Sequence, residues 1–183
     1  MLLDNIKEKY NCDKVALFLD DKNKNVFCII KDTKIEVINE FEENIGHLYY
    51  ENGKNDLIYL RNIEVNEDYQ SKKIGSNLLD LFEEIVVKDG SKKVYGIFEP
   101  KNIKASKFYK HKGYNFIKIN KYFEKNSKLN FLSLNEKTYL SEGDVLLSKN
   151  INKKGIEKFI EYDDFYIQKN ILEKDNDLIK KRT

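Results

Sequence analysis

A short polar stretch at residues 70–76 has the composition of a phosphate-binding loop. It reads QSKKIGS and stands between a strand-like run and a helix-like run. The first backbone N–H groups of a helix have no partner within the helix, and the helix dipole is positive at that end. Such an end favours an anion, and Gly75 would let the backbone come close to one. The stretch is thus a candidate phosphate loop, although an ordinary loop before a helix would look the same.

The two cysteines do not indicate chemistry. Cys12 and Cys28 lie in or beside apolar strand-like stretches, and their spacing is not that of a metal site. We therefore expect buried, inert thiols, no metal, and no covalent cysteine mechanism.

The elements that would position the loop follow from the hydrophobic pattern. Asn52-Gly53 predicts a hairpin turn, so 47–51 and 57–65 should pair antiparallel. A helix should begin at Asn102, a good N-cap, and end at Gly113. Apolar residues at helical spacing predict two further helices, over 2–9 and from 74 to 89. Apolar and β-branched runs predict strands over 15–21, 25–31, 34–41, 47–51, 57–65, 92–98, 114–119, 128–134 and 144–151.

This order of elements predicts a mixed α/β domain of the α+β kind over residues 1–151. Its sheet should be mostly antiparallel, except around the two crossover helices. Residues 152–183 differ in character, and we expect them to form a helical extension of one or two helices with a basic tail.

Two motifs, in this order along the chain, resemble the GNAT superfamily of acyl-CoA-dependent N-acyltransferases. In the first, NIEVNEDYQSKKIGSNLL, Gln70 and Gly75 match the family's coenzyme A signature, which joins a strand to a helix. In the second, EPKNIKASKFYKHKGYNF, the matching residues are Asn102, Ala105, Tyr109, Gly113 and Tyr114. The resemblance covers about residues 45–151 and implies a GNAT-like fold in which two central strands splay apart.

The resemblance implies that acetyl-CoA binds in the opening between the strands 57–65 and 92–98. The pantetheine arm would pair with backbone groups of the first strand, and the backbone of 71–76 would hold the pyrophosphate. The cofactor-binding residues implied by position are Ile63, Glu64, Val65, Gln70, Ser71, Lys72, Lys73, Ile74, Gly75, Ser76, Asn102 and Tyr109.

The resemblance further implies transfer of an acetyl group from acetyl-CoA to a primary amine, by direct attack of the amine on the thioester. Tyr109 would protonate the departing thiolate as general acid, and a backbone N–H would stabilise the oxyanion. Tyr109 also fits an apolar helix face beside Phe108, which would make it a core residue instead. The alternative function is a catalytically silent acyl-CoA-binding or scaffold domain of the same fold.

The sequence leaves the general base open. Glu64 and Glu99 lie at or near the two central strands and are the candidates, and water could serve instead. Of the two histidines, His111 stands at a helix end, where capping is the expected role, and His47 lies on an expected strand as a further candidate.

Two features depart from the family's pattern. Lys73 stands at the first glycine of the signature, where a positive φ would cost about 1 kcal/mol of strain. Residues 15–51 read as strands, where the family usually carries two helices that shape the acceptor pocket. We therefore expect the aromatic segment 152–183 to cover that opening, within one chain or across a homodimer.

The composition argues against nucleic-acid and membrane partners. The 183 residues carry 33 basic and 31 acidic side chains, a net charge of +2, without a basic stripe interleaved with aromatics. No apolar run approaches the roughly 20 residues of a membrane helix. The start, MLLDNIKEKY, lacks the features of a signal peptide. We expect a cytoplasmic enzyme whose partner is an amine, either a small molecule or a protein amine.

Overall fold

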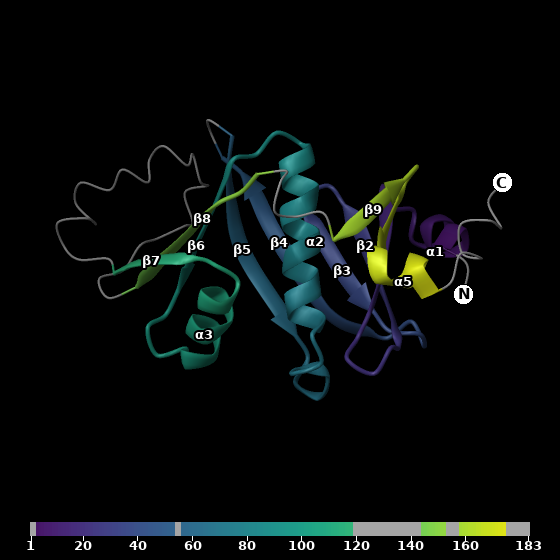
Figure 1. Ribbon diagram of the computed structural model, residues 1–183, viewed down its shortest axis with the longest axis horizontal. Helices are drawn as coiled ribbons and strands as arrows, with labels where there is room; N and C mark the ends of the chain where they lie inside the picture. Colours follow the sequence, from purple (N-terminus) through teal and green to yellow (C-terminus); the bar gives the residue numbers. More distant parts are fainter. Residues whose placement is uncertain (1–2, 54–55, 119–143, 153–157, 175–183) are drawn as a thin grey trace. The chain divides into compact units, whose positions relative to one another are not determined.

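The computed structural model describes residues 3–53, 56–118, 144–152 and 158–174 (Figure 1). Its helices are α1 Leu3–Tyr10, α2 Ile74–Lys88, α3 Ile103–His111 and α5 Lys169–Lys174, with a 3-10 helix η1 Glu67–Tyr69. Its strands are β1 Lys14–Leu19, β2 Asn25–Lys31, β3 Lys34–Ile38, β4 Asn44–Asn52, β5 Leu57–Val65, β6 Lys93–Phe98, β7 Asn115–Lys118, β8 Val145–Asn150, β9 Phe159–Tyr162 and β10 Phe165–Gln168.

The strands form a ten-stranded sheet in the order β7-β8-β6-β5-β4-β3-β2-β1-β10-β9. The pairs β1–β2, β2–β3, β6–β8, β7–β8 and β9–β10 are antiparallel. The pairs β5–β6 and β1–β10 are parallel, and α2 connects the first of these pairs. The expected α+β fold with a mixed, mostly antiparallel sheet is therefore confirmed. Among the described residues, no helix is long and apolar enough to cross a membrane.

The chain divides into two compact units. Unit 1 comprises Met1–Leu48, Ile63–Glu84 and Ile156–Thr183, and unit 2 comprises Tyr49–Asn62 and Ile85–Gly155. In unit 1 a cluster of buried apolar side chains joins α1 to β1, β2 and β10. Its members include Leu3, Ile6, Val15, Leu17, Phe27, Ile29 and Phe165. The apolar residues of the first strands thus pack against α1.

The C-terminal segment corrects one expectation. Residues 159–168 form a β-hairpin rather than a helix, and only α5 after it is helical. Strand β10 adds to β1 in parallel, with Val15 opposite Phe165. The hairpin reverses direction at Asp163, whose φ of 51° is one that Asp tolerates in a tight turn. Local turn chemistry and pairing with β1 therefore override the helical spacing of the aromatic residues.

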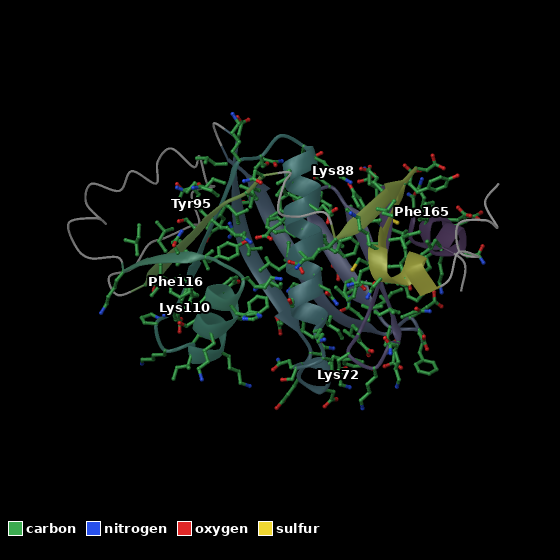
Figure 2. All side chains as sticks on the ribbon, viewed as in Figure 1. Lys72, Lys88, Tyr95, Lys110, Phe116 and Phe165 are labelled. Carbon is green, nitrogen blue, oxygen red and sulfur yellow. The ribbon has the colours of Figure 1, made fainter. Side chains whose placement is uncertain are left out.

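The expected aromatic cluster of this segment is buried within unit 1. Phe159, Phe165 and Tyr166 are each at most 3% exposed, and Phe159 makes an edge-to-face contact with Phe18 of β1. Figure 2 labels Phe165 on β10. The aromatic residues of this segment were expected to need a surface to bury against, and packing within unit 1 provides it. The cover over the acceptor opening stays a prediction.

Strand β3 is shorter than the sequence predicts because Asn39 ends it. The Asn39 side-chain oxygen accepts hydrogen bonds from the backbone N–H groups of Phe41 at 2.9 Å and Glu43 at 3.0 Å. Such an Asx turn draws the chain away from the sheet. The strand therefore ends at Ile38 and not at Phe41.

In unit 2 the elements follow the expected order (Figure 1). Aromatic rings join α3 to β6. Phe98 of β6 contacts Tyr109 of α3 and Phe116 of β7, with ring centroids 5.9 and 5.2 Å apart. Strand β6 is only half-buried, although its sequence predicts a buried strand. The strand expected over 128–134 and the hairpin residues 54–55 lie outside the described residues.

Candidate active site

The loop between β5 and α2 contains two residues with left-handed backbone. Ser71 has a φ of 60° and Lys73 a φ of 66°, both in the left-handed region. Helix α2 begins immediately afterwards at Ile74. A left-handed residue followed by a right-handed one turns successive N–H groups toward one concave side. The positive φ expected at Lys73 is therefore present, although no glycine stands there.

Hydrogen bonds to the neighbouring β1 end fix this loop. The Lys72 carbonyl accepts a hydrogen bond from the Asp21 N–H at 3.0 Å. The Asn77 side-chain amide in the first turn of α2 donates to the Leu19 carbonyl at 3.0 Å. These contacts hold both sides of Lys73 and so offset the strain of its backbone, which is about 1 kcal/mol.

The side chains of the loop are positioned by its own residues. The Gln70 side-chain amide donates to the Val65 carbonyl at 2.9 Å, which closes the turn after β5. The Lys72 ammonium lies 5.3 Å from the centre of the Tyr69 ring (Lys72 is labelled in Figure 2). The Tyr69 hydroxyl in turn accepts a hydrogen bond from Asn39 at 2.9 Å. Lys72 and Gln70 are thus partly structural, and the exposed Lys73 side chain remains directed to solvent.

Glycine is required where β4 meets the end of β5. A Cβ atom added to Gly46 would lie 2.6 Å from the carbonyl oxygen of Glu64 and 3.3 Å from the Cα of Val65. The two backbones therefore approach more closely than any side chain allows. This close contact positions the backbone of the segment 63–65, which leads into the loop 70–76.

The same contact region brings two titratable groups together. His47 Nε2 on β4 lies 3.7 Å from Glu64 Oε2 on β5. The Glu64 side chain is 64% exposed and that of His47 is 23% exposed. Glu64 was a candidate base from the sequence and His47 an additional one, and unit 1 joins them in one pair.

In unit 2, strands β5 and β6 stop pairing before either strand ends. Their parallel register runs from Leu57 opposite Lys93 to Leu60 opposite Gly96. Strand β6 continues to Phe98 while pairing with β8 on its other side. Among the described residues, the pairing of the two central strands therefore ends at Leu60 and Gly96, as the resemblance implies for strands that splay apart.

Tyr109 lies on the buried face of α3 within a cluster of aromatic rings. Its ring stacks on Phe98 and contacts Phe108 and Tyr114 edge-to-face, with centroid distances of 5.2 to 5.9 Å. The residue is 8% exposed, and burial, with a smaller effect of Tyr59, raises the pKa of its hydroxyl to about 12. Within the described part of the chain, this hydroxyl has no hydrogen-bond partner.

Three other predicted residues have ordinary structural surroundings. The Asn102 side-chain oxygen accepts a hydrogen bond from the Ala105 N–H at 3.0 Å, so Asn102 caps α3 as expected. Its expected contact with the cofactor stays a prediction. Glu99 is exposed and accepts the Asn102 N–H through its backbone carbonyl at 3.0 Å. His111 is exposed in the last turn of α3.

The predicted site residues thus fall into two groups. Unit 1 holds the segment 63–65, the loop 70–76 and the His47–Glu64 pair. Unit 2 holds Glu99, Asn102 and Tyr109.

Other residues with reactive side chains stand apart from these groups. Cys12 and Cys28 are buried free thiols whose pKa values are raised by burial, as expected of inert cysteines. Over the described ranges, no three His, Cys, Asp or Glu side chains gather around a common point.

The sequence did not single out one buried residue of unit 2, Tyr59. Tyr59 of β5 is 6% exposed, and after burial it is the second cause that raises the pKa of Tyr109. The spacing of Tyr59 and Arg61, two residues apart on one strand, is the signal that could have pointed to a shared face.

A family model described as acetyltransferase (GNAT) family matches residues 3–114. No curated protein is significantly similar in sequence to the chain. Among solved structures, a GNAT-family acetyltransferase from Staphylococcus aureus is 19% identical, with 80% of this chain and 74% of that chain covered and a TM-score of 0.50.

Two further solved structures have the same fold. A putative acyl-CoA N-acyltransferase from Klebsiella pneumoniae is 12% identical, with 65% of this chain and 73% of that chain covered and a TM-score of 0.52. Ard1 from Thermoplasma volcanium is 13% identical, with 66% of this chain and 72% of that chain covered and a TM-score of 0.52. At these identities the structures support the fold, and the family model covers more than half of the sequence. The chain therefore belongs to the GNAT family of acetyltransferases.

Proposed function

We propose that the protein is an N-acetyltransferase that moves an acetyl group from acetyl-CoA to a primary amine. The observation that carries the proposal is the loop 71–76, which keeps positive φ angles at Ser71 and Lys73 although neither residue is glycine. Left-handed backbone at such residues costs energy and is retained where the surrounding structure fixes it. An anion-binding backbone at the start of α2 supplies a reason for that cost.

The residues present fit coenzyme A in two respects. The N–H groups at the start of α2 suit a pyrophosphate, and Lys73 beside them adds an exposed ammonium group. The parting of β5 and β6 after Leu60 and Gly96 suits an amide-rich arm that adds to a strand edge. The proposed cofactor-binding residues are Ile63, Glu64, Val65, Gln70, Ser71, Lys72, Lys73, Ile74, Gly75, Ser76, Asn102 and Tyr109. Bound acetyl-CoA supplies the acetyl group as a thioester.

Tyr109 is the proposed general acid. Because the pKa of its hydroxyl is raised to about 12, it carries its proton at neutral pH and can donate it to a departing thiolate. Its buried hydroxyl, which lacks a hydrogen-bond partner among the described residues, is a polar group that needs explanation. A role as proton donor to the departing sulfur of coenzyme A would explain this unpartnered hydroxyl.

Glu64, with His47 beside it, is the proposed general base. An acceptor amine is protonated at neutral pH and must lose a proton before it attacks the thioester. The exposed Glu64 carboxylate can take that proton directly or through water, and His47 at 3.7 Å can orient it. Glu99 is the second candidate for this role, since it is exposed just after β6.

The C-terminal hairpin is the proposed contact between two copies of the chain. Strand β9 stands last in the strand order, and its Ile160 is 38% exposed, which suits a homodimer through the segment 152–183. Sedimentation of the wild type and of Ile160→Lys tests this part. A monomeric wild type would remove the dimer and leave the proposed chemistry unchanged.

The experiment that tests the function titrates acetyl-CoA into the protein by calorimetry and then measures coenzyme A release with primary amines. We expect binding, with amine-dependent release of coenzyme A and an N-acetylated product identified by mass spectrometry. Binding without turnover would favour a catalytically silent acyl-CoA-binding domain. Absence of binding would remove both functions.

A further inference from the structure

Gln168, the last residue of β10, joins the C-terminal hairpin to the first turn of α2 through its side chain. Its side-chain oxygen accepts a hydrogen bond from the Leu19 N–H at 3.0 Å. Its side-chain amide donates to the side-chain oxygen of Asn77 at 3.3 Å. The Asn77 amide in turn donates to the Leu19 carbonyl at 3.0 Å. Three residues that are distant in sequence thus close a ring of three hydrogen bonds.

This ring fixes the orientation of both side-chain amides. A backbone N–H only donates and a carbonyl only accepts, so the Gln168 oxygen and the Asn77 nitrogen must face Leu19. The remaining nitrogen of Gln168 then meets the remaining oxygen of Asn77. Both side chains are half-buried, and an apolar replacement of either one leaves hydrogen-bonding groups of the ring without their partner.

The ring is connected directly to the left-handed residue of the loop 71–76. The backbone N–H of Asn77 donates to the Lys73 carbonyl at 3.0 Å, and Lys73 has a φ of 66°. On the other side of Lys73, the Lys72 carbonyl accepts a hydrogen bond from the Asp21 N–H at 3.0 Å. A strained backbone conformation persists only where the surrounding structure holds it. The ring is one of the two attachments that hold it here.

Two further contacts attach the C-terminal segment to the same helix. The Lys158 ammonium pairs with the Asp80 carboxylate at 2.9 Å, and the Phe159 N–H donates to the Glu84 carboxylate at 3.2 Å. Asn77, Asp80 and Glu84 are spaced by three and four residues, so they lie on one face of α2. All of these residues belong to unit 1. The segment that carries the glutamine is therefore attached to α2 at several points.

We propose that Gln168 is a positioning residue for acetyl-CoA binding, which acts through Asn77 to hold the loop 71–76 in the conformation that receives the pyrophosphate. The inference rests on the proposed function and gives the C-terminal hairpin a part in cofactor binding. A loop that is already ordered does not have to be ordered when the ligand binds, and this raises affinity. Gln168 is assigned no contact with the reacting atoms, so its loss should affect binding and not the chemical step.

The variant Gln168→Met tests the inference, because it keeps the length of the side chain and removes its hydrogen bonds. We expect the Kd for acetyl-CoA, measured by calorimetry, to rise about fivefold, as for the loss of one net hydrogen bond. At saturating acetyl-CoA, kcat with a primary amine that the wild type acetylates should stay unchanged. A purely structural loss of active protein would instead lower kcat and leave the Kd unchanged.

Hydrogen exchange of the free protein reports on the loop without any cofactor. The backbone N–H groups of Asn77 and Asp21 are hydrogen-bonded to the loop, and both should exchange faster in Gln168→Met than in the wild type. Exchange in β2 and β3 should stay the same, which shows that the variant is folded.

A second variant and a control make the test specific. Asn77→Ala should weaken acetyl-CoA binding to a similar extent, and the double variant should bind about as well as either single variant, because both changes break the same ring. Lys158→Met is the matched control. It removes a contact between the same segment and the same helix, but one turn further from the loop, and it should leave the Kd unchanged.

The outcomes separate this inference from the function on which it rests. Equal acetyl-CoA affinity in Gln168→Met and the wild type, or losses that add in the double variant, would overturn the inference and leave the N-acetyltransferase intact. Absence of acetyl-CoA binding by the wild type would overturn the proposed function, and with it the part of Gln168 in cofactor binding. Unchanged exchange at Asn77 and Asp21 would overturn the positioning of the loop in either case.

Discussion

His47 and Glu64 lie side by side on the neighbouring strands β4 and β5, with 3.7 Å between the imidazole Nε2 and the carboxylate Oε2. Gly46, next to His47, makes the pair possible, because any Cβ there would press on the Glu64 carbonyl. The sequence names both residues as candidates without showing that they meet. Their pairing makes Glu64 a stronger candidate for the base than Glu99.

Replacing Glu64 by Gln should lower kcat about a hundredfold, since a positioned base contributes that much to proton transfer. The KM for acetyl-CoA should change little, because the amide keeps the size of the side chain. Steady-state kinetics with a primary amine that is acetylated by the wild type measures both constants. Glu8→Gln on α1, also an exposed glutamate, serves as the control and should behave as the wild type. Equal rates for Glu64→Gln and the control would transfer the role to Glu99 or to water.

Replacing Lys73 by Gly should raise the free energy of unfolding by about 0.5 kcal/mol. The change removes left-handed strain of about 1 kcal/mol at a φ of 66°, partly offset by the greater freedom of Gly in the unfolded chain. Urea denaturation measures the effect. Lys72→Gly is the matched control, and it should be destabilising because Lys72 has no positive φ in this structure. Destabilisation by Lys73→Gly would show that the lysine side chain contributes more than its backbone costs.

The stability of the protein should fall between about pH 10 and pH 12 in a way that depends on Tyr109. The folded-state pKa of Tyr109, about 12, lies above its ordinary value of 10.0. The unfolded chain therefore releases this proton first, and the stability present below pH 10 is lost as the pH rises toward 12. The free energy of unfolding measured across this range should fall less steeply in Tyr109→Phe than in the wild type. Parallel curves would show that Tyr109 titrates normally in the folded protein.

Replacing Phe159 by Ala should cost about 3 kcal/mol of folding free energy. Phe159 is 3% exposed and its ring contacts Phe18, so the shortened side chain leaves a cavity. The hydrogen bond from its backbone N–H to the Glu84 carboxylate remains in the variant. Ile160→Ala at the next residue is the control, and it should cost less than half as much because Ile160 is 38% exposed. Chemical denaturation of both variants measures the difference. A small loss in Phe159→Ala would mean that the hairpin contributes little to unit 1.

Local signals in the sequence predict the elements that carry the phosphate loop and the proposed acid. Helix α2 is found over 74–88 because its apolar spacing and Asp89-Gly90 define both ends, and Gly90 indeed has a φ of 94°. Asn102 caps α3 because its side chain meets the Ala105 N–H three residues on. These features depend only on neighbouring residues.

Features that depend on distant pairing are not predictable in the same way. Residues 159–168 have aromatic residues at helical spacing, and only the partner strand β1 shows that they form a hairpin. The meeting of His47 and Glu64 depends on how closely β4 approaches β5, which Gly46 decides.

The most direct test of the account is the rate of coenzyme A release at saturating acetyl-CoA, with and without each of a panel of primary amines, for the wild type and for Tyr109→Phe. The account predicts release that requires an amine and yields one acetylated amine for each coenzyme A. It also predicts a rate about a hundredfold lower in Tyr109→Phe, which keeps the aromatic ring and should still bind acetyl-CoA. Amine-dependent release at equal rates in both proteins would contradict the role of Tyr109, and the absence of release with every amine in the wild type would contradict the proposed activity.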